Sequence, residues 1–248
     1  MGKRYAVTDI HGMWSLWQDI KNYCKPDDTI YFLGDAADRG PDGIRIMKDL
    51  LEDKRVIYLK GNHEMMFAWI IAELWEGIDS NVEYWVQNGG RPTCEAILTM
   101  SDAEITDLYN KIISLPDHLI IDNAKGQHIL LSHAGTSLDY TDADFKAMKY
   151  EQYYLWDRGH FLRKWPQDDA YKDYYIVHGH TPNAYIIKRF NEMNAFYGKS
   201  LLTDSRDEVF TYADGHKFGL DIATYATKKV ALFDLDELKV EAYFEIKE

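Results

Sequence analysis

The chain has 248 residues, of which 46% are hydrophobic and 14% aromatic, which is typical of a folded protein and not of a disordered one. Its formal net charge of -13 argues against an electrostatic nucleic-acid binder, because a phosphate backbone selects basic surfaces. No apolar run is long enough to span a membrane, and residues 1–4 lead into a strand without the apolar core of a signal peptide. The two cysteines, Cys24 and Cys94, have no zinc-site spacing. We therefore expect a cytoplasmic protein with reduced thiols and without nucleic-acid or membrane partners.

The first predicted strand, at residues 4–7, leads into Asp9-Ile10-His11-Gly12. Asp9 and His11 are two residues apart, so in extended backbone their side chains point to the same side. A carboxylate and an imidazole that converge at a strand end can share one metal ion. Taken alone, Asp-x-His is matched by chance at least as often as by a real site. The spacing of apolar residues then predicts a helix over 13–23.

Two further strands lead into loops that open with glycine. The apolar run 29–33 precedes Gly34-Asp35-Ala36-Ala37-Asp38-Arg39-Gly40, and the run 56–59 precedes Gly61-Asn62-His63-Glu64. A helix after Gly43 separates them. The order strand, helix, strand, helix, strand predicts a parallel sheet with right-handed crossovers, and ligands bind beyond the carboxyl ends of such strands. We therefore expect both loops to form the rim of an active site.

Residues 65–115 are predicted to be helical and carry many large aromatic side chains, with a loop at Asn88-Gly89-Gly90-Arg91-Pro92-Thr93. Pro92 suits the first turn of the next helix, and Ser101 to Glu104 match a capping box. Most of these aromatic residues are interpreted as helix packing over the sheet. Trp85 and Asn88 could instead form a wall that faces the substrate.

The second half of the chain is predicted to contain more strands. A hairpin at 119–121 and 128–131 ends at Ser132-His133-Ala134-Gly135, and a strand at 176–177 leads into His178-Gly179-His180-Thr181-Pro182. Several strands follow in the tail, 218–246. The sequence shows no internal repeat, low-complexity tract or linker, so we predict one domain over residues 1–248, with the helical segment at about 65–115 beside the active site.

Five strand ends together carry side chains that can bind metal or transfer protons: Asp9 and His11, Asp35 and Asp38, Asn62 and His63, His133, and His180. Each has an ordinary explanation when taken singly. Asp and Asn after glycine are common turn residues, and a lone His is more often a satisfied core residue than a ligand. Together they suit a two-metal site, with hard oxygen and imidazole ligands, no thiolate, and one carboxylate able to bridge.

In this order, Asp-x-His-Gly, Gly-Asp-x-x-Asp-Arg-Gly, Gly-Asn-His-Glu, Ser-His-Ala-Gly and Val-x-Gly-His-Thr resemble the motifs of the metallophosphoesterase (calcineurin-like) superfamily. With Asn88-Gly89-Gly90-x-x-Thr93, they resemble more narrowly the compact bacterial and phage form of the phosphoprotein phosphatase branch. The likeness spans roughly Asp9 to Pro182. It implies an α/β fold, a four-layer α-β-β-α sandwich of two mixed sheets flanked by helices, with the β-rich tail completing the second sheet.

The resemblance also implies two divalent metal ions. The ligands of the first would be Asp9, His11 and Asp35. Those of the second would be Asp35, which bridges, with Asn62, His133 and His180. From ligand hardness and family likeness we expect Mn²⁺, although Fe and Zn fit the same ligands.

The same resemblance implies the catalytic roles. A metal-bridging hydroxide would attack phosphorus in line, and His63 would protonate the leaving oxygen as the general acid. Asp38 would hold His63 by a hydrogen bond, and Arg39 would grip the phosphoryl oxygens. Arg158, in Trp-Asp-Arg, resembles the family's later phosphate-binding arginine, on a looser match.

Three positions depart from the pattern or leave it open. Lys60 stands where many relatives have Arg, so it cannot make a bidentate grip, and either phosphate affinity is lower or Lys60 does not reach the substrate. Pro182 stands where nucleases and purple-type phosphatases place a second His, which disfavours those branches. His178 is as compatible with supporting the site as with facing elsewhere.

The sequence is compatible with three functions. We favour a dinuclear-metal phosphomonoester hydrolase, a serine/threonine protein phosphatase whose substrate is a phosphorylated protein or a small phosphoester. The alternative is a diadenosine tetraphosphate hydrolase, which Asp38 disfavours because those enzymes tend to resemble Gly-Asp-x-x-Ala-Arg-Gly. A non-catalytic binding protein that keeps the fold is disfavoured, because every ligand position, the proton donor and its Asp partner are present. The sequence specifies no oligomeric state.

Overall fold

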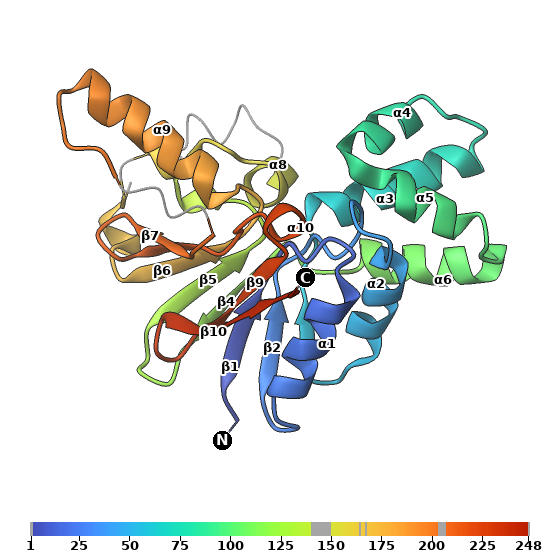
Figure 1. Ribbon diagram of the computed structural model, residues 1–248, viewed down its shortest axis with the longest axis horizontal. Coiled ribbons are helices and arrows are strands. Elements are labelled where there is room, and N and C mark those ends of the chain that lie inside the picture. Colours follow the sequence, from blue (N-terminus) through green and yellow to red (C-terminus); the bar gives the residue numbers. More distant parts are fainter. Residues whose placement is uncertain (1, 140–149, 164, 167, 203–206, 248) are drawn as a thin grey trace.

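A computed structural model describes residues 2–139, 150–163, 165–166, 168–202 and 207–247. Its centre consists of two five-stranded sheets that face each other, with helices on the outer face of each (Figure 1). Both sheets mix parallel and antiparallel pairs. The structure therefore confirms the expected α/β sandwich of two mixed sheets.

The first sheet has the strand order β10-β9-β1-β2-β3. Its parallel part consists of β1 (Arg4–Val7), β2 (Thr29–Phe32) and β3 (Val56–Tyr58), connected by helices α1 (Trp14–Tyr23) and α2 (Gly43–Glu52). On the other side of β1, two antiparallel strands follow, β9 (Lys229–Asp234) and β10 (Lys239–Glu245). The predicted order of strands and helices in this region is confirmed.

The second sheet has the order β4-β5-β6-β8-β7. The predicted hairpin is present as β4 (His118–Asp122) and β5 (His128–Ser132), and β6 (Tyr174–His178) runs parallel to β5. The other two strands are β7 (Phe210–Tyr212) and β8 (Lys217–Gly219). The tail was expected to complete this sheet, but only β8 does so, because β9 and β10 pair beside β1 in the first sheet.

Side chains alternate between the two faces of each strand, and this alternation builds the layers. In β1, Tyr5 and Val7 pack with the apolar residues of α1 and α2, whereas Ala6 points toward the second sheet. Val177 of β6 and Phe233 of β9 meet Ala6 in the core between the sheets. This core lies directly below the strand ends that carry the polar loops, so it fixes the loops of both sheets relative to one another.

The helical segment forms a separate mass beside the first sheet, on the right of Figure 1. It consists of α3 (Asn62–Trp75), α4 (Val82–Trp85), a π-turn (Val86–Gly90), α5 (Arg91–Ile97) and α6 (Asp102–Ile113). The loop expected at 88–93 is instead this π-turn running into α5, with a kink at Gly89, whose φ is 100°. Pro92 lies in the first turn of α5, and the capping box of Ser101 and Glu104 starts α6, as predicted.

The outer face of the second sheet is covered mainly by α9 (Asn183–Phe196), with α8 (Tyr150–Leu155) near its upper edge (Figure 1). Shorter turns complete the described residues: 3₁₀ turns at Ser137–Asp139, His160–Leu162 and Asp169–Tyr171, and α10 (Thr224–Thr227). Among the described helices, none combines the length and apolar character that crossing a membrane requires. Neither cysteine forms a disulfide.

Candidate metal centre and active site

Six of the predicted site residues have left-handed backbone, which residues other than glycine rarely adopt. Their φ angles lie between 45° and 67°, and they are Asp9, His11, Asp35, Asp38, Arg39 and His180. All six lie just beyond the carboxyl ends of β1, β2 or β6. Such backbone costs about 1–3 kcal/mol per residue and persists only where the surrounding structure holds it, which is common at functional sites.

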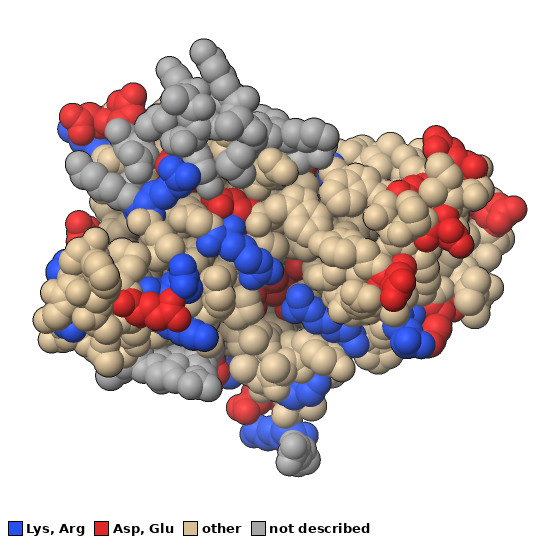
Figure 2. All heavy atoms as spheres, turned by 90° about the horizontal axis from the view of Figure 1, so that it is seen from above, with Lys and Arg blue, Asp and Glu red and all other residues tan. Residues whose placement is uncertain are grey.

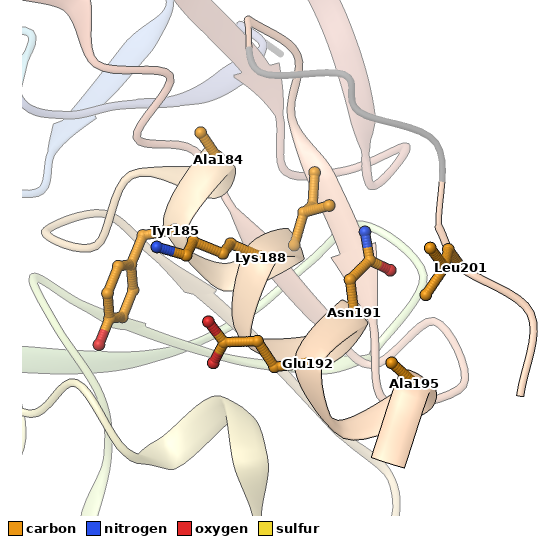
Figure 3. A pocket seen from close by; sticks show the side chains of 8 residues that line it. Ala184, Tyr185, Lys188, Asn191, Glu192, Ala195 and Leu201 are labelled. Carbon is orange, nitrogen blue, oxygen red and sulfur yellow. The ribbon is translucent and has the colours of Figure 1, made fainter. Parts of the chain in front are cut away.

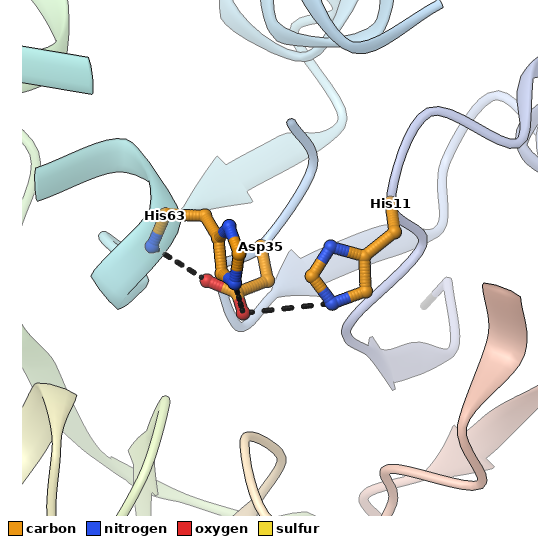
Figure 4. Close-up of side chains that lie close together, drawn as sticks. All are labelled: His11, Asp35 and His63. Carbon is orange, nitrogen blue, oxygen red and sulfur yellow. Dashed lines mark hydrogen bonds and ion pairs between the residues drawn. The ribbon is translucent and has the colours of Figure 1, made fainter. Parts of the chain in front are cut away.

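Asp35 forms the first cluster of candidate ligands with His11 and His63 (Figure 4). Its Oδ2 lies 3.7 Å from Nε2 of His11 and 3.7 Å from Nε2 of His63. Asp9 Oδ1 lies 3.8 Å from the same nitrogen of His11. All four side chains are buried. The parallel pairing of β1 with β2 thus brings together the three residues predicted to hold the first metal.

A second cluster shares Asp35 and adds His133 and His180 from the second sheet. Nε2 of His133 lies 3.3 Å from Oδ1 of Asp35 and 2.9 Å from Oδ1 of Asn62. Nδ1 of His180 lies 2.8 Å from the same Asn62 oxygen. The four residues predicted to hold the second metal are therefore also brought together, with Asp35 between the two clusters.

The imidazole rings are oriented by bonds to backbone oxygens. Nδ1 of His11 lies 3.0 Å from the carbonyl oxygen of Ala37, and Nδ1 of His133 lies 2.8 Å from that of Leu33. Donation through Nδ1 directs Nε2 of each ring at the centre of the site. Among the described residues, Nε2 of His11 is buried without a hydrogen-bond partner, 3.7 Å from Oδ2 of Asp35 and 3.8 Å from Oδ1 of Asp9. A buried nitrogen without a partner beside carboxylates is what a cation-binding site requires, so these residues fit two divalent cations.

Charges in the metal-free protein are strongly coupled at this site. Burial alone would raise the pKa of Asp35, but the imidazoles of His133, His63 and His11 outweigh it and hold the pKa well below its usual range. Burial would lower the pKa of His133, but Asp35 raises it to about 9. Burial also raises the pKa of Asp9, and Asp35 adds to this rise. Cations would relieve the repulsion between these two carboxylates.

His63 is held at both ring nitrogens. Its Nδ1 donates to Oδ2 of Asp38 over 2.6 Å, and its Nε2 lies 3.4 Å from Nη2 of Arg39. Burial would lower the pKa of His63, but the carboxylates of Asp35 and Asp38 outweigh burial and raise it. The distance between Nε2 of His63 and Asp35 would by itself permit His63 as a metal ligand. The positive guanidinium of Arg39 beside Nε2, however, disfavours a metal cation at that nitrogen. The arrangement instead suits a proton donor.

Two residues of the helical segment, Trp85 and Thr93, hold Asp38. Trp85 Nε1 donates to Oδ2 of Asp38 over 2.8 Å, and Thr93 Oγ1 donates to Oδ1 over 2.5 Å. The indole of Trp85 is therefore buried against Asp38, while Asn88 is exposed and donates to the carbonyl oxygen of Tyr84. Thr93 had a sequence signal, since it ends the Asn-Gly-Gly-x-x-Thr element.

Glu64, for which the sequence predicts no role, also holds the loops of the site together. Its carboxylate accepts from the backbone N–H groups of Asp35, Ala36 and Gly61 at 2.7–2.8 Å. It therefore ties the loop after β2 to the start of α3. Its place in Gly-Asn-His-Glu, directly after two site residues, was the available signal.

Two of the predicted cationic residues differ in their surroundings. Arg158 is exposed, and it lies near enough to His180 to add to the lowering of that residue's pKa, after burial and His133. The ammonium group of Lys60 is buried and lies 3.3 Å from Oδ1 of Asp117. Arg158 thus lies on the His180 side of the site, whereas the contact shown by Lys60 is a pairing within the protein.

His178 faces away from the candidate ligands. Its Nε2 lies 2.8 Å from the hydroxyl oxygen of Tyr212, and its ring meets that of His160 edge to face at 4.6 Å. Burial lowers the pKa of His178 to about 3. Of the two readings left open by the sequence, the structure favours a strand-end side chain that faces elsewhere.

Cavities lie elsewhere on the surface. One of about 630 Å³ runs along α9, lined by residues such as Tyr185, Lys188 and Asn191 (Figure 3). It contains no candidate ligand. A smaller one of about 180 Å³ lies between α3 and α4, and Trp85 forms part of its wall. Of these two cavities, only the smaller one adjoins a residue that touches the site.

Comparison with known proteins agrees with this geometry. Residues 3–198 match the family described as calcineurin-like phosphoesterase. The asymmetrical bis(5′-nucleosyl)-tetraphosphatase PrpE of Anoxybacillus flavithermus is 26% identical over 71% of this chain and 77% of its own. Serine/threonine-protein phosphatase 1 of Salmonella typhimurium is 27% identical over 78% of this chain and 83% of its own.

Among solved structures, a metallophosphoesterase from Sphaerobacter thermophilus superimposes with a TM-score of 0.56 and 15% identity, covering 99% of this chain and 88% of its own. At that identity the likeness establishes the fold. The sequence match spans most of the chain and includes every candidate ligand. Since the buried His and Asp clusters lie inside the matched region, the chain belongs to the calcineurin-like phosphoesterase family of metal-dependent hydrolases.

Proposed function

We propose that this hydrolase is a dinuclear-metal phosphomonoesterase that acts as a serine/threonine protein phosphatase. The observation that carries the proposal is the His63–Asp38 pair, joined over 2.6 Å, with Nε2 of His63 facing Asp35 at 3.7 Å. A proton donor held beside a cluster of metal ligands is what phosphomonoester cleavage needs for its leaving oxygen.

The proposed ligands are drawn from the two clusters, with Asp9 in place of His63 in the first and Asn62 added to the second. Asp9, His11 and Asp35 would hold one cation. Asp35, Asn62, His133 and His180 would hold the other. When bound, two divalent cations supply Lewis acidity that activates water and offsets the charge of the phosphoryl group. Mn²⁺ is the proposed metal, and Fe and Zn suit the same ligands.

Side chains of the protein would bind the phosphoryl group and donate the proton. Arg39, next to His63, would hold the phosphoryl oxygens with its planar fork, and Arg158 would approach them from the side of His180. His63 would give its Nε2 proton to the leaving oxygen while Asp38 holds Nδ1 and so fixes the tautomer. The backbone of Arg39 is held by its N–H, which donates to the carbonyl oxygen of Gly89 over 2.8 Å.

Charge beside the site supports a protein substrate over a dinucleoside polyphosphate. The helical segment, residues 62–113, has nine acidic and two basic residues, a net charge of -7. Figure 2 shows acidic side chains gathered over this part of the molecule, at its right. A polyphosphate carries several negative charges and would be repelled there, whereas a phosphopeptide with neutral or basic neighbours would not. The exposed rings of Trp69 and Tyr84 on the same segment suit peptide contacts.

Hydrolysis of dinucleoside polyphosphates is the second candidate, because the similarity to the PrpE enzyme is as strong as that to the protein phosphatase. The first experiment removes metal with a chelator, adds Mn²⁺ back and measures p-nitrophenyl phosphate hydrolysis. Recovered activity is expected, and folded protein that is inactive with every divalent metal would contradict the proposal. Turnover of a phosphoserine peptide is then compared with that of diadenosine tetraphosphate. Faster turnover of the dinucleotide would favour the second candidate.

A further inference from the structure

We propose that Trp85 and Thr93 are positioning residues, which hold Asp38 so that His63 can give its proton to the leaving group. The inference rests on the proposed function, in which His63 is the general acid. It adds two residues that do not touch the substrate and that belong to the helical segment, not to the strand-end loops.

Asp38 is surrounded by hydrogen bonds on both carboxylate oxygens. Oδ2 accepts from His63 Nδ1 over 2.6 Å and from Trp85 Nε1 over 2.8 Å. Oδ1 accepts from Thr93 Oγ1 over 2.5 Å. The hydroxyl of Thr93 also accepts from the backbone N–H of Asp38 over 3.1 Å. One residue therefore fixes both the main chain and the side chain of Asp38, and the other fixes the oxygen that faces His63.

These bonds matter because Asp38 is fully buried and has left-handed backbone, with a φ of 67°. Without the two donors, the carboxylate could turn about its last side-chain bond, and the 2.6 Å bond to His63 would loosen. A general acid acts only when its proton points at the leaving oxygen, so a displaced imidazole loses rate without losing metal ligands. The metal clusters do not include Asp38, Trp85 or Thr93.

The π-turn Val86–Gly90 brings the two donors to the same carboxylate. A β-carbon added at Gly90 would lie 2.5 Å from the indole of Trp85, so only glycine leaves room for the ring. Trp85 and Thr93 are each about 1% exposed, and a purely structural role in the core would explain that burial. It would not explain why the polar atom of each meets the same carboxylate, since both contacts need directed donors.

The test uses the chemistry of the leaving group. p-Nitrophenol is a much stronger acid than phenol, so p-nitrophenyl phosphate needs little help from a general acid, whereas phenyl phosphate and phosphoserine need more. General acids contribute roughly 10²–10⁴-fold to the rate of such reactions. We expect Trp85→Phe and Thr93→Val each to lose part of this contribution and to lower kcat on phenyl phosphate about 10-fold or more. On p-nitrophenyl phosphate the loss should be several-fold smaller, and bound Mn²⁺ should equal that of the wild type.

Matched controls are available in the same segment. Trp75→Phe and Thr99→Val make the same chemical changes at exposed positions away from Asp38, and both should leave the ratio of the two rates unchanged. In a His63→Asn background, Trp85→Phe should cause no further loss, because a residue that acts through His63 has nothing left to position.

The outcomes separate the two proposals. Wild-type protein that hydrolyses neither ester would overturn the proposed function and this inference with it. An active wild type whose Trp85 and Thr93 variants lose rate equally on both esters would overturn this inference alone, since it would show a general structural role. Further loss on adding Trp85→Phe to His63→Asn would overturn it as well.

Discussion

The carboxylate of Asp35 lies close to residues from three other segments of the chain, at His11, His63 and His133. Its Oδ1 accepts from the backbone N–H of His63 over 3.0 Å and lies 3.3 Å from Nε2 of His133. Its Oδ2 faces His11 and the ring of His63. No other described carboxylate belongs to both clusters of candidate ligands. Its removal should therefore affect both cations, whereas removal of His63 should affect only the chemistry.

Replacing His63 and Asp35 separates these roles. His63→Asn should reduce turnover of a phosphoserine peptide about 10²–10⁴-fold while two Mn²⁺ per chain remain bound. Asp35→Asn should lose metal together with activity, because the shared carboxylate charge is gone. Metal content by elemental analysis, beside the rates, checks both. A His63→Asn protein stripped of metal would show that His63 is a ligand and that its proposed role is wrong.

Buried His178 predicts sensitivity of the fold to acid. Burial lowers its pKa from the usual 6.5 to about 3, so between these values the unfolded chain binds a proton that the folded protein does not. Stability contributed by the neutral ring is therefore present above about pH 6.5 and is lost as the pH falls toward 3, by up to about 1.4 kcal/mol per pH unit.

Urea unfolding of the wild type and His178→Gln at pH 7 and pH 5 measures this effect. A chelator in both samples removes any contribution from metal release. The wild type should lose more stability than the variant between the two pH values, while His160 and Tyr212, which face His178, are present in both. Equal losses in the two proteins would mean that His178 does not titrate in this range on unfolding.

The sequence could predict the candidate ligands because each lies within a few residues of a strand that is recognisable by its apolar run. It could not predict that Trp85 and Thr93 reach Asp38. These contacts join residues 47 and 55 positions apart, and they depend on how a bend between two helices is oriented. Hydrophobic periodicity identifies helices but says nothing about the direction of such a bend.

The π-turn is the element that joins the helical segment to the site. Gly89 has a φ of 100°, and its carbonyl oxygen accepts from the N–H of Arg39 over 2.8 Å. A β-carbon at this position would lie 2.7 Å from Cγ of Arg39. The turn thus sets the position of Arg39 as well as that of Asp38.

Gly89→Ala should therefore displace Arg39. We expect kcat/KM for p-nitrophenyl phosphate to fall about 10-fold, the value of a weakened charge-assisted contact, with a loss of stability of about 1 kcal/mol or more. Gly77→Ala is the matched control, since Gly77 also has positive φ, at 73°, but has nothing within 4 Å of an added β-carbon. It should lose stability without losing rate. Similar kinetics in both variants would show that Gly89 does not govern Arg39.

Elements whose apolar residues recur at a regular spacing could be predicted from the sequence. The sheet in which the tail strands β9 and β10 pair could not. Helices α1 and α2 and the β4–β5 hairpin follow from apolar spacing and turn residues. In β9, Leu232 faces the helix side of the sheet and Phe233 faces the core between the sheets. A strand with two apolar faces fits the interior of either sheet, so its sequence alone did not decide which one it joins.

At the scale of the whole molecule, the candidate ligands come from both sheets. Asp9 and Asp35 follow strands of the first sheet, and His133 and His180 follow strands of the second. Bound cations would therefore bridge the two halves of the sandwich. They would stabilise the folded protein by mass action, because the unfolded chain does not bring these residues together.

Thermal unfolding with chelator and with increasing Mn²⁺ checks this prediction. Tm should rise with metal concentration, and at about 100 times the Kd each ion should add about 2.7 kcal/mol. Asp35→Asn should show little of this rise. A wild-type Tm that does not respond to any divalent metal would mean that the clusters do not bind cations in solution.

The position of β1 between β2 and β9 has a consequence for protein synthesis. As the chain leaves the ribosome, β2 can pair with β1 early, but the other edge of β1 stays open until residues 229–234 appear. An open edge can pair with another chain, so a stalled or truncated product would be prone to aggregate. Asp9 lies two residues after β1, and His180, whose backbone N–H donates to Asp9, is synthesised after residue 179. The enzyme would therefore gain its activity only after residues 229–234 have been synthesised and can pair with β1.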